Sequence, residues 1–177
     1  MSEPSPKPKS PGNAPQAAAR ALELASLAAT GRLARRLAPH LRAGDVIGLQ
    51  GPLGIGKTAF ARALIRALLG PAGAGEEVPS PTFTLVQTYA VPTEAGETPL
   101  YHFDLYRLAR SEDAYELGIE EAFADGISLV EWPERLGSLL PRDRLELELS
   151  TGAKPTARHA RLVGRGAWAK RLEGLVP

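Results

Sequence analysis

The sequence predicts an α/β fold with three layers and a mixed, partly antiparallel central sheet. Segments with strand-like and helix-like patterns follow one another along most of the chain. Two strand-like segments, 82–91 and 99–107, are separated by a link that contains Pro92 and Gly96 and is too short for a crossover helix. We therefore expect these two strands to pair in antiparallel fashion, which makes the sheet mixed.

The length and composition predict a single domain. With 177 residues, of which 44% are hydrophobic, the chain can bury one substantial core but is too short for two domains of ordinary size. We place this domain at residues 20–177. Residues 1–19 are rich in proline, serine, lysine and alanine, and are predicted to form a disordered tail.

The charge balance and residue usage exclude several kinds of site. The 21 basic and 20 acidic residues give a net charge of +1, so any link to RNA is expected to be indirect. The absence of cysteine excludes disulfides, cysteine zinc sites and thiol nucleophiles, and the three scattered histidines are interpreted as solvated or structural. No segment approaches the roughly 20 apolar residues that cross a bilayer, and no signal-peptide core is present, which predicts a cytoplasmic protein.

The remaining elements follow from hydrophobic spacing and capping signals. Apolar residues recur at helical spacing over 26–39, with Ser26 as a candidate N-cap. A buried strand over 45–50 precedes a helix over 57–68 that stops at Gly70. Further along, we expect a short helix at 112–124, strands at 126–132, 144–149 and 159–163, and a closing helix at 167–175.

Residues 51–58 form the pattern G-x-x-x-x-G-K-T, the signature of a phosphate-binding loop. Because it lies between a strand and a helix, the fold is predicted to be P-loop NTPase-like. The glycines let backbone N–H groups surround a phosphate, and the helix N-terminus favours its negative charge. Lys57 should reach the β- and γ-phosphates of ATP, and the Thr58 hydroxyl should bind Mg²⁺. The predicted nucleotide-binding residues here are Gly51, Leu53, Gly54, Ile55, Gly56, Lys57, Thr58 and Ala59.

A carboxylate is needed to complete a Mg²⁺-dependent site, and two acidic residues are candidates. Glu131 ends the apolar segment 127–130, which places it where an open α/β sheet positions its ligands, and it is the first choice as a metal ligand. Asp104 lies in an aromatic strand and could hold a metal-bound or attacking water. The alternative is that these acids form structural ion pairs, for example between Asp104 and Arg107. Lys57 and the two acids are the predicted catalytic residues.

A segment rich in hydroxyl groups, 80–84, precedes the first of the paired strands. In phosphate-loop enzymes such a segment can sense the γ-phosphate through a hydroxyl near Mg²⁺ and relax after hydrolysis. Ser80 and Thr82 are therefore candidate nucleotide-binding residues. An ordinary turn is the alternative, because Ser-Pro and Pro-Thr pairs are common turn material.

Four sequence blocks occur in a fixed order: GPLGIGKT, SPTFTLVQTY, YHFDLYRL and LVEWPERL. Together they resemble the bacterial TsaE (YjeE) family over about residues 24–141. The resemblance implies an ATPase partner in the synthesis of threonylcarbamoyladenosine, a modified adenosine of tRNA. It also implies TsaB and TsaD as protein partners, which this ATPase resets between turnovers without itself transferring the threonylcarbamoyl group.

The resemblance also implies roles for particular residues. Thr58 and Glu131 look like the Mg²⁺ ligands of the family, and Asp104 looks like its aspartate in the HFDLYR block. Trp132 matches the aromatic residue after the metal-binding acid, which makes it a candidate nucleotide contact. Residues 80–82 resemble the switch-like segment of the family.

The residues taken alone leave other activities open. A small-molecule P-loop kinase is the main alternative, although such an enzyme usually needs a mobile lid with an arginine, which Arg107, Arg110 and Arg135 could supply only loosely. A nucleotide-gated binding module with negligible turnover is a further possibility. A GTPase is disfavoured because the sequence has no Asn-Lys-x-Asp element for guanine. No arginine finger stands out, so slow turnover that partners stimulate is expected.

Overall fold

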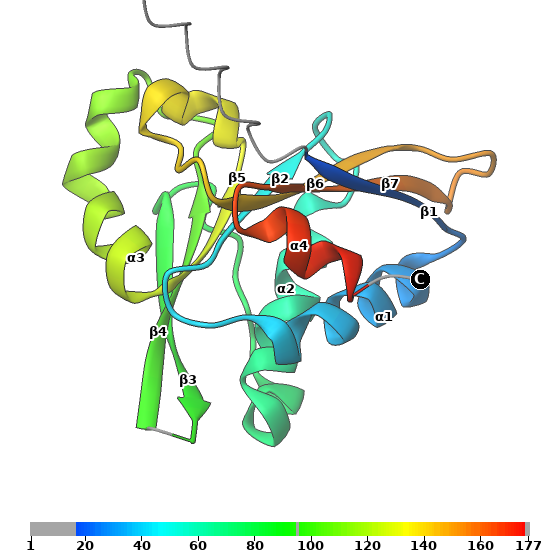
Figure 1. Cartoon of the computed structure of the whole chain (residues 1–177), viewed down its shortest axis with the longest axis horizontal. Coiled ribbons are helices and arrows are strands. Elements are labelled where there is room, and N and C mark those ends of the chain that lie inside the picture. Colours follow the sequence, from blue (N-terminus) through cyan, green and yellow to red (C-terminus); the bar gives the residue numbers. More distant parts are fainter. Residues whose placement is uncertain (1–16, 95, 176–177) are drawn as a thin grey trace, which may run out of the picture.

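The computed structural model describes residues 17–94 and 96–175, and within them one sheet carries seven strands (Figure 1). The strands are β1 (Ala18–Leu24), β2 (Val46–Gln50), β3 (Val86–Thr93), β4 (Gly96–Asp104), β5 (Ile127–Glu131), β6 (Arg144–Thr151) and β7 (Arg158–Arg165). Their spatial order is β1, β7, β6, β2, β5, β4, β3. The central strands from β6 to β4 are parallel, whereas the β1–β7, β7–β6 and β4–β3 pairs are antiparallel. The predicted mixed, partly antiparallel sheet is confirmed.

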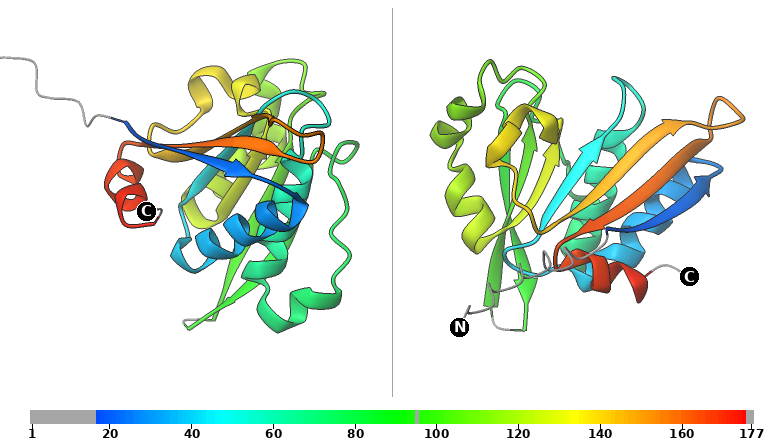
Figure 2. Two further views of the ribbon diagram at one scale, coloured as in Figure 1. Left: turned by 90° about the vertical axis from the view of Figure 1, so that its right-hand side faces the viewer. Right: turned by 45° about the horizontal axis from the view of Figure 1, so that its top comes forward.

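Helices cover both faces of this sheet and complete the predicted three layers (Figure 2). The α-helices are α1 (Leu27–Leu37), α2 (Lys57–Leu68), α3 (Ile119–Asp125) and α4 (Trp168–Glu173), and the 3₁₀ helices are η1 (Ala38–His40), η2 (Gly70–Gly75), η3 (Ser111–Leu117) and η4 (Pro133–Leu139). α1 and α2 pack on one face, and α3, η3 and η4 on the other. α4 packs beside β7 and β1. None of the helices in the described residues has the length and apolar character that crossing a membrane requires.

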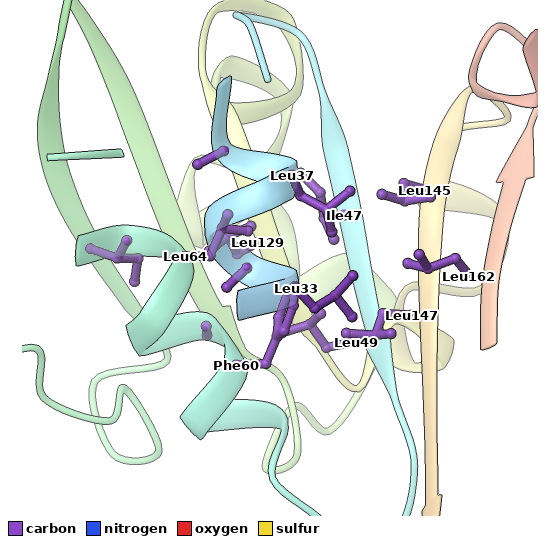
Figure 3. Close-up of a cluster of buried hydrophobic side chains, with 14 of the residues drawn as sticks. Leu33, Leu37, Ile47, Leu49, Phe60, Leu64, Leu129, Leu145, Leu147 and Leu162 are labelled. Carbon is purple, nitrogen blue, oxygen red and sulfur yellow. The ribbon is translucent and has the colours of Figure 1, made fainter. Parts of the chain in front are cut away.

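The two cores follow from the alternation of side chains along β2. Ile47 and Leu49 belong to the larger core, where they meet Phe60 and Leu64 of α2 (Figure 3). Val46 belongs to the smaller core, which α3, η3 and η4 cover on the opposite face. Because both faces of β2 are buried, the strand is apolar nearly throughout, and its packing fixes the position of the loop that follows it.

Strand β1 corrects the predicted domain boundary. It begins at Ala18, inside the segment expected to be a disordered tail, and its residues pair with β7 from Ala18 to Leu24. The rest of that predicted tail, residues 1–16, lies outside the described residues. The strand sequence AARALEL has no β-branched or aromatic residue, so its conformation depends on pairing with β7 rather than on local preference.

Two further predictions need correction at their ends. Residues 82–85 were expected in a strand but form a turn, and β3 begins only at Val86. The helix expected at 112–124 is divided into η3 and α3 by Gly118, whose φ of 75° is left-handed. The antiparallel pairing of β3 with β4 is confirmed, and it extends to the tip, where Thr93 faces Gly96.

The sheet brings the carboxyl ends of β2, β5 and β4 to one edge. Glu131, the last residue of β5, pairs in register with Leu49 of β2 and with Asp104 of β4. The backbone N–H of Asp104 also donates a hydrogen bond of 3.0 Å to the carbonyl oxygen of Leu85, which joins the turn before β3 to the end of β4. Both acids therefore lie beside the loop that follows β2.

Candidate functional site

The loop between β2 and α2 depends on backbone angles that favour glycine. Gly51 has a φ of 133° and Gly56, at the start of α2, a φ of 118°. A Cβ atom at Gly51 would also collide with the carbonyl oxygen of Leu149. The chain can therefore turn tightly at the end of β2 and direct the N-terminus of α2 toward the cavity beside it.

This cavity has a volume of about 200 Å³ and is lined by the loop, α2, the turn before β3 and the ends of β4 and β5. Its lining residues are Leu53, Gly54, Gly56, Lys57, Thr58, Ala59, Thr82, Asp104, Tyr106, Glu131 and Trp132. Three of the predicted site residues do not line it. Gly51 lies at the start of the loop, Ile55 is buried in the larger core, and Ser80 lies behind Thr82. The fold thus gathers the other predicted residues around one space.

Lys57 is held against the loop in this structure. Its Nζ donates hydrogen bonds to the carbonyl oxygens of Gly51 (2.6 Å) and Pro52 (2.9 Å). It also lies 3.9 Å from the centroid of the Trp132 ring, a cation–π contact. Burial lowers the pKa of Lys57 from its ordinary value, and the negative charges of Glu131, Glu134 and Asp104 oppose that shift.

Glu131 is hydrogen-bonded through both carboxylate oxygens. The Thr58 hydroxyl donates to Oε2 at 2.8 Å, and His102 Nε2 lies 2.9 Å from Oε1. Glu131 is buried and His102 is completely buried, so these contacts are shielded from water. Of the two interpretations given to the histidines, solvated or structural, the structural one holds for His102. Thr58 keeps its oxygen lone pairs available, since its hydrogen is directed to Glu131.

Asp104 is also fixed at both oxygens. Thr82 Oγ1 donates to Oδ2 at 2.9 Å, and the backbone N–H of Tyr106 donates to Oδ1 at 3.1 Å. Ser80 Oγ lies 2.7 Å from Thr82 Oγ1, so a series of hydrogen bonds runs from Asp104 through Thr82 to Ser80 in the hydroxyl-rich segment. The alternative ion pair with Arg107 is not formed, and within the described residues Arg107 instead lies over the ring of Phe83.

Trp132 has an unusual backbone conformation for a bulky residue. Its φ of 60° and ψ of 50° are left-handed, and Leu85, in the turn before β3, has a φ of 65°. At Trp132 this turn follows directly on β5 and brings the indole ring over Lys57 and against Tyr106, whose ring centroid is 4.9 Å away. One wall of the cavity is therefore aromatic.

Three residues of this region were not assigned a site role from the sequence. Tyr106 lines the cavity and lies two residues after Asp104, so the YHFDLYRL block could have pointed to it. His102 belongs to the same block. Arg158 of β7 donates from Nε to the carbonyl oxygen of Ile55 at 2.7 Å and so supports the loop from the far side. No local pattern identifies Arg158, because the contact joins segments 103 residues apart.

The donor atoms at the cavity fit a hard divalent cation that is shared with phosphates. Thr58 and Glu131 offer oxygen ligands, which Mg²⁺ prefers. Among the residues that the structure describes, no group of three His, Cys, Asp or Glu residues could hold a metal ion on its own. Mg²⁺ commonly uses one or two protein ligands together with substrate phosphates and water, so a small oxygen set beside a phosphate loop is the expected arrangement.

Comparisons with known proteins identify the family. A family model described as "Threonylcarbamoyl adenosine biosynthesis protein TsaE" matches residues 24–160, which include the phosphate loop and both acids. A protein named tRNA threonylcarbamoyladenosine biosynthesis protein TsaE from Streptomyces coelicolor is 40% identical over 142 residues, covering 77% of this chain and 92% of that protein. One of the same name from Rickettsia bellii is 40% identical over 120 residues, covering 68% and 78%.

The fold comparison agrees with the sequence comparison. A crystal structure of YdiB from Bacillus subtilis superposes with a TM-score of 0.71 at 28% identity, covering 90% of this chain and 95% of that chain. The similarity therefore includes the sheet and both helical layers, as well as the loop. Since the matched segment carries the whole candidate site, the chain belongs to the TsaE family of proteins for threonylcarbamoyladenosine biosynthesis in tRNA.

Proposed function

We propose that this chain binds and hydrolyses ATP with Mg²⁺ and thereby drives a TsaB–TsaD complex in the threonylcarbamoyladenosine modification of tRNA. The observation that carries the proposal is the hydrogen bond between Thr58 and Glu131, which connects the phosphate loop to an acid at the end of a neighbouring parallel strand. Metal-dependent phosphoryl chemistry uses such a pair of oxygen ligands.

The phosphate loop supplies the groups of the site that attract negative charge. Backbone N–H groups of the loop and the N-terminus of α2 bind the phosphates. Lys57 exchanges its hydrogen bonds with Gly51 and Pro52 for bonds to the β- and γ-phosphates, and it leaves the Trp132 ring as it does so. Thr58 and Glu131 hold Mg²⁺, which when bound neutralises charge on the phosphate oxygens.

Asp104 is the better placed of the two acids to order water. Glu131 is occupied by Thr58 and His102, whereas Asp104 accepts one of its hydrogen bonds from Thr82, in the turn before β3. A change at Thr82 would free Oδ2 of Asp104 to accept a hydrogen bond from a water molecule at the γ-phosphate. Through Ser80 and Thr82, the presence or loss of the γ-phosphate would thus change which groups are hydrogen-bonded to Asp104.

Slow turnover by the isolated protein follows from the residues around the cavity. No arginine in the described part of the chain lines it. A group supplied by a partner to neutralise transition-state charge is worth about 10³ to 10⁵ in rate in related hydrolases. TsaB and TsaD are the proposed source of that stimulation, and the net charge of +1 supports an indirect relation to tRNA.

The test is the rate of ATP hydrolysis by this protein alone and with TsaB and TsaD from the same source. The Lys57→Ala variant measures the background. Turnover that requires Lys57 and rises with the partners is the expected result. Turnover that the partners leave unchanged would contradict the proposal, and a panel of hydroxyl compounds would then test the alternative of a small-molecule kinase by phosphorylated product.

A further inference from the structure

His102 is a completely buried polar residue at the candidate site, where its hydrogen-bond partner is Glu131. It lies in β4 on the same face as Leu100 and Asp104, which are two residues away on either side. Its register partner on β5 is Leu129, two residues before Glu131. The ring therefore lies next to Glu131 and contacts the carboxylate oxygen that Thr58 does not contact.

The two ring nitrogens of His102 have different surroundings. Nε2 lies 2.9 Å from Oε1 of Glu131, whereas Nδ1 is buried without a hydrogen-bond partner in the described structure. An ionised carboxylate only accepts hydrogen bonds, so Nε2 is the donor in this contact. His102 thus donates its side-chain hydrogen bond in this structure to Glu131.

Packing alone does not account for a histidine at this position. The neighbouring side chains Leu100 and Leu129 are apolar and fully buried, and a leucine would fill the space without a buried, unpaired nitrogen. An unsatisfied buried polar atom is unfavourable and uncommon in native proteins. The hydrogen bond to Glu131 is the interaction that only the histidine supplies here.

We propose that His102 is a positioning residue for Glu131. By holding Oε1, it fixes the rotation of the carboxylate so that Oε2 faces Thr58 and the Mg²⁺ position, and it does this before nucleotide arrives. The terminal torsion of glutamate is otherwise broad, so a carboxylate bonded only to Thr58 would sample orientations that lose the metal. The role rests on the proposed Mg²⁺–ATP function.

Three substitutions separate positioning from packing. In His102→Gln, the amide nitrogen can take the place of Nε2 and donate to Glu131. In His102→Asn, a similar amide is carried on a shorter side chain, near the place of Nδ1, and does not reach Glu131. In His102→Leu, the donor is absent but the buried volume remains apolar. The glutamine and asparagine variants form the matched pair, because they differ in reach and share polarity.

The first measurement is the affinity for Mn²⁺, which suits the same oxygen ligands as Mg²⁺ and is detected by electron paramagnetic resonance. It is made with full-length protein and a non-hydrolysable ATP analogue, and the affinity for the analogue alone is measured in a chelator. Loss of a residue that supports a metal ligand costs about 10- to 100-fold in metal affinity. We expect such a loss in His102→Asn and His102→Leu, near wild-type affinity in His102→Gln, and unchanged metal-free binding of the analogue in all three.

The inference is overturned if the glutamine and asparagine variants bind Mn²⁺ equally well or equally poorly. This comparison remains decisive if His102→Leu does not fold. A wild-type protein that binds no metal–nucleotide complex would refute the proposed function, and the positioning role with it.

A second measurement does not depend on nucleotide. Nitrogen-15 NMR of the imidazole ring should show hydrogen on Nε2 in the wild-type protein. The Nε2–H proton should lose its hydrogen-bonded shift in Glu131→Ala. An Nε2 without hydrogen, or an Nε2–H signal that does not change in Glu131→Ala, would overturn the inference even if Mg²⁺–ATP binding is confirmed.

Discussion

The Thr58 hydroxyl donates a hydrogen bond of 2.8 Å to Glu131, and this single contact joins the start of α2 to the end of β5. The two residues are 73 positions apart in the sequence. Their proximity follows from the parallel pairing of β2 with β5, because the residues that follow two parallel strands emerge at the same edge of the sheet. The contact makes the phosphate loop and the acid one site.

Replacing Lys57 by alanine should abolish tight binding of triphosphate. The ammonium group would otherwise form charge-assisted hydrogen bonds to the phosphates, so we expect affinity to fall by about 100-fold or more. Calorimetric titration with a non-hydrolysable ATP analogue measures this. Lys170→Ala, at an exposed position in α4, is the control. A Lys57→Ala protein with normal affinity would refute the assignment of the loop.

Glu131→Gln and Asp104→Asn should fail in different ways. Glu131→Gln removes the negative charge of a proposed metal ligand, so metal-dependent turnover should fall by about 100-fold or more. The affinity for nucleotide without metal should change little. Asp104→Asn should lower turnover but keep nearly normal affinity for Mn²⁺, because Asp104 is proposed to order the attacking water. Single-turnover hydrolysis and Mn²⁺ titration distinguish them. Unchanged hydrolysis by Glu131→Gln would mean that Asp104, and not Glu131, is the acid that binds Mg²⁺.

Trp132 should report nucleotide binding by its fluorescence. Lys57 lies 3.9 Å from the ring centroid, and its movement to the phosphates would remove that charge from the indole. We expect emission to change on titration with the ATP analogue in wild-type protein and in Trp168→Phe, whose substituted residue lies in α4. Trp132→Phe should lose the change. Unchanged emission in Trp168→Phe, in which Trp132 is the remaining tryptophan, would mean that Lys57 and Trp132 do not separate.

The affinity for triphosphate should fall with rising pH earlier than an ordinary lysine would predict. Burial lowers the pKa of Lys57 below 10.5, although Glu131, Glu134 and Asp104 oppose the shift. The free protein therefore loses this proton at a lower pH, and the charge that favours phosphate binding is lost as pH rises through the lowered pKa. Analogue affinity measured on the alkaline side should decline in the wild-type protein and not in Lys57→Arg, whose charge persists.

Asp45 should contribute more to stability than an exposed acid. Its buried carboxylate is paired with Arg171 of α4, with 2.8 Å from Nη2 to Oδ2, and accepts the backbone N–H of Arg42 at 2.9 Å. Asp45→Ala leaves the N–H of Arg42 without its acceptor and Arg171 without its charge partner, with only the His40 carbonyl oxygen still bound at 2.6 Å, so the free energy of unfolding should fall by about 2–4 kcal/mol. Urea unfolding followed by circular dichroism measures it.

The matched control for that experiment is the exposed ion pair between Glu148 and Arg161. Glu148→Ala should cost less than about 1 kcal/mol, because water and salt screen the pair. Equal losses in Asp45→Ala and Glu148→Ala would mean that burial adds nothing at Asp45.

Local patterns were sufficient for the elements that carry the phosphate loop. The glycine and lysine spacing of residues 51–58 requires a strand before and a helix after, and β2 and α2 occur there. Ser26 is confirmed as the N-cap of α1, since its hydroxyl accepts the N–H of Ala29 at 3.3 Å. Each of these features depends on residues that are neighbours in the chain.

Features that depend on distant contacts were not predictable in this way. β1 requires pairing with β7, which lies more than 100 residues further on, and Arg158 reaches the loop only because β7 is beside β6. His102 has no local pattern that distinguishes a solvated ring from a buried donor. Its role depends on the register that places β4 beside β5, so the sequence of this chain alone does not reveal it.

The hairpin of β3 and β4 extends from the turn beside the cavity to a second groove of the molecule. It is continuously paired from Val86 and Phe103 to the tip at Thr93 and Gly96, and the bond between Asp104 and Leu85 attaches it to the turn beside the cavity. The tip region borders a groove of about 830 Å³ at the other end of the hairpin. The hairpin is therefore a continuous hydrogen-bonded connection from the turn beside the cavity to that groove.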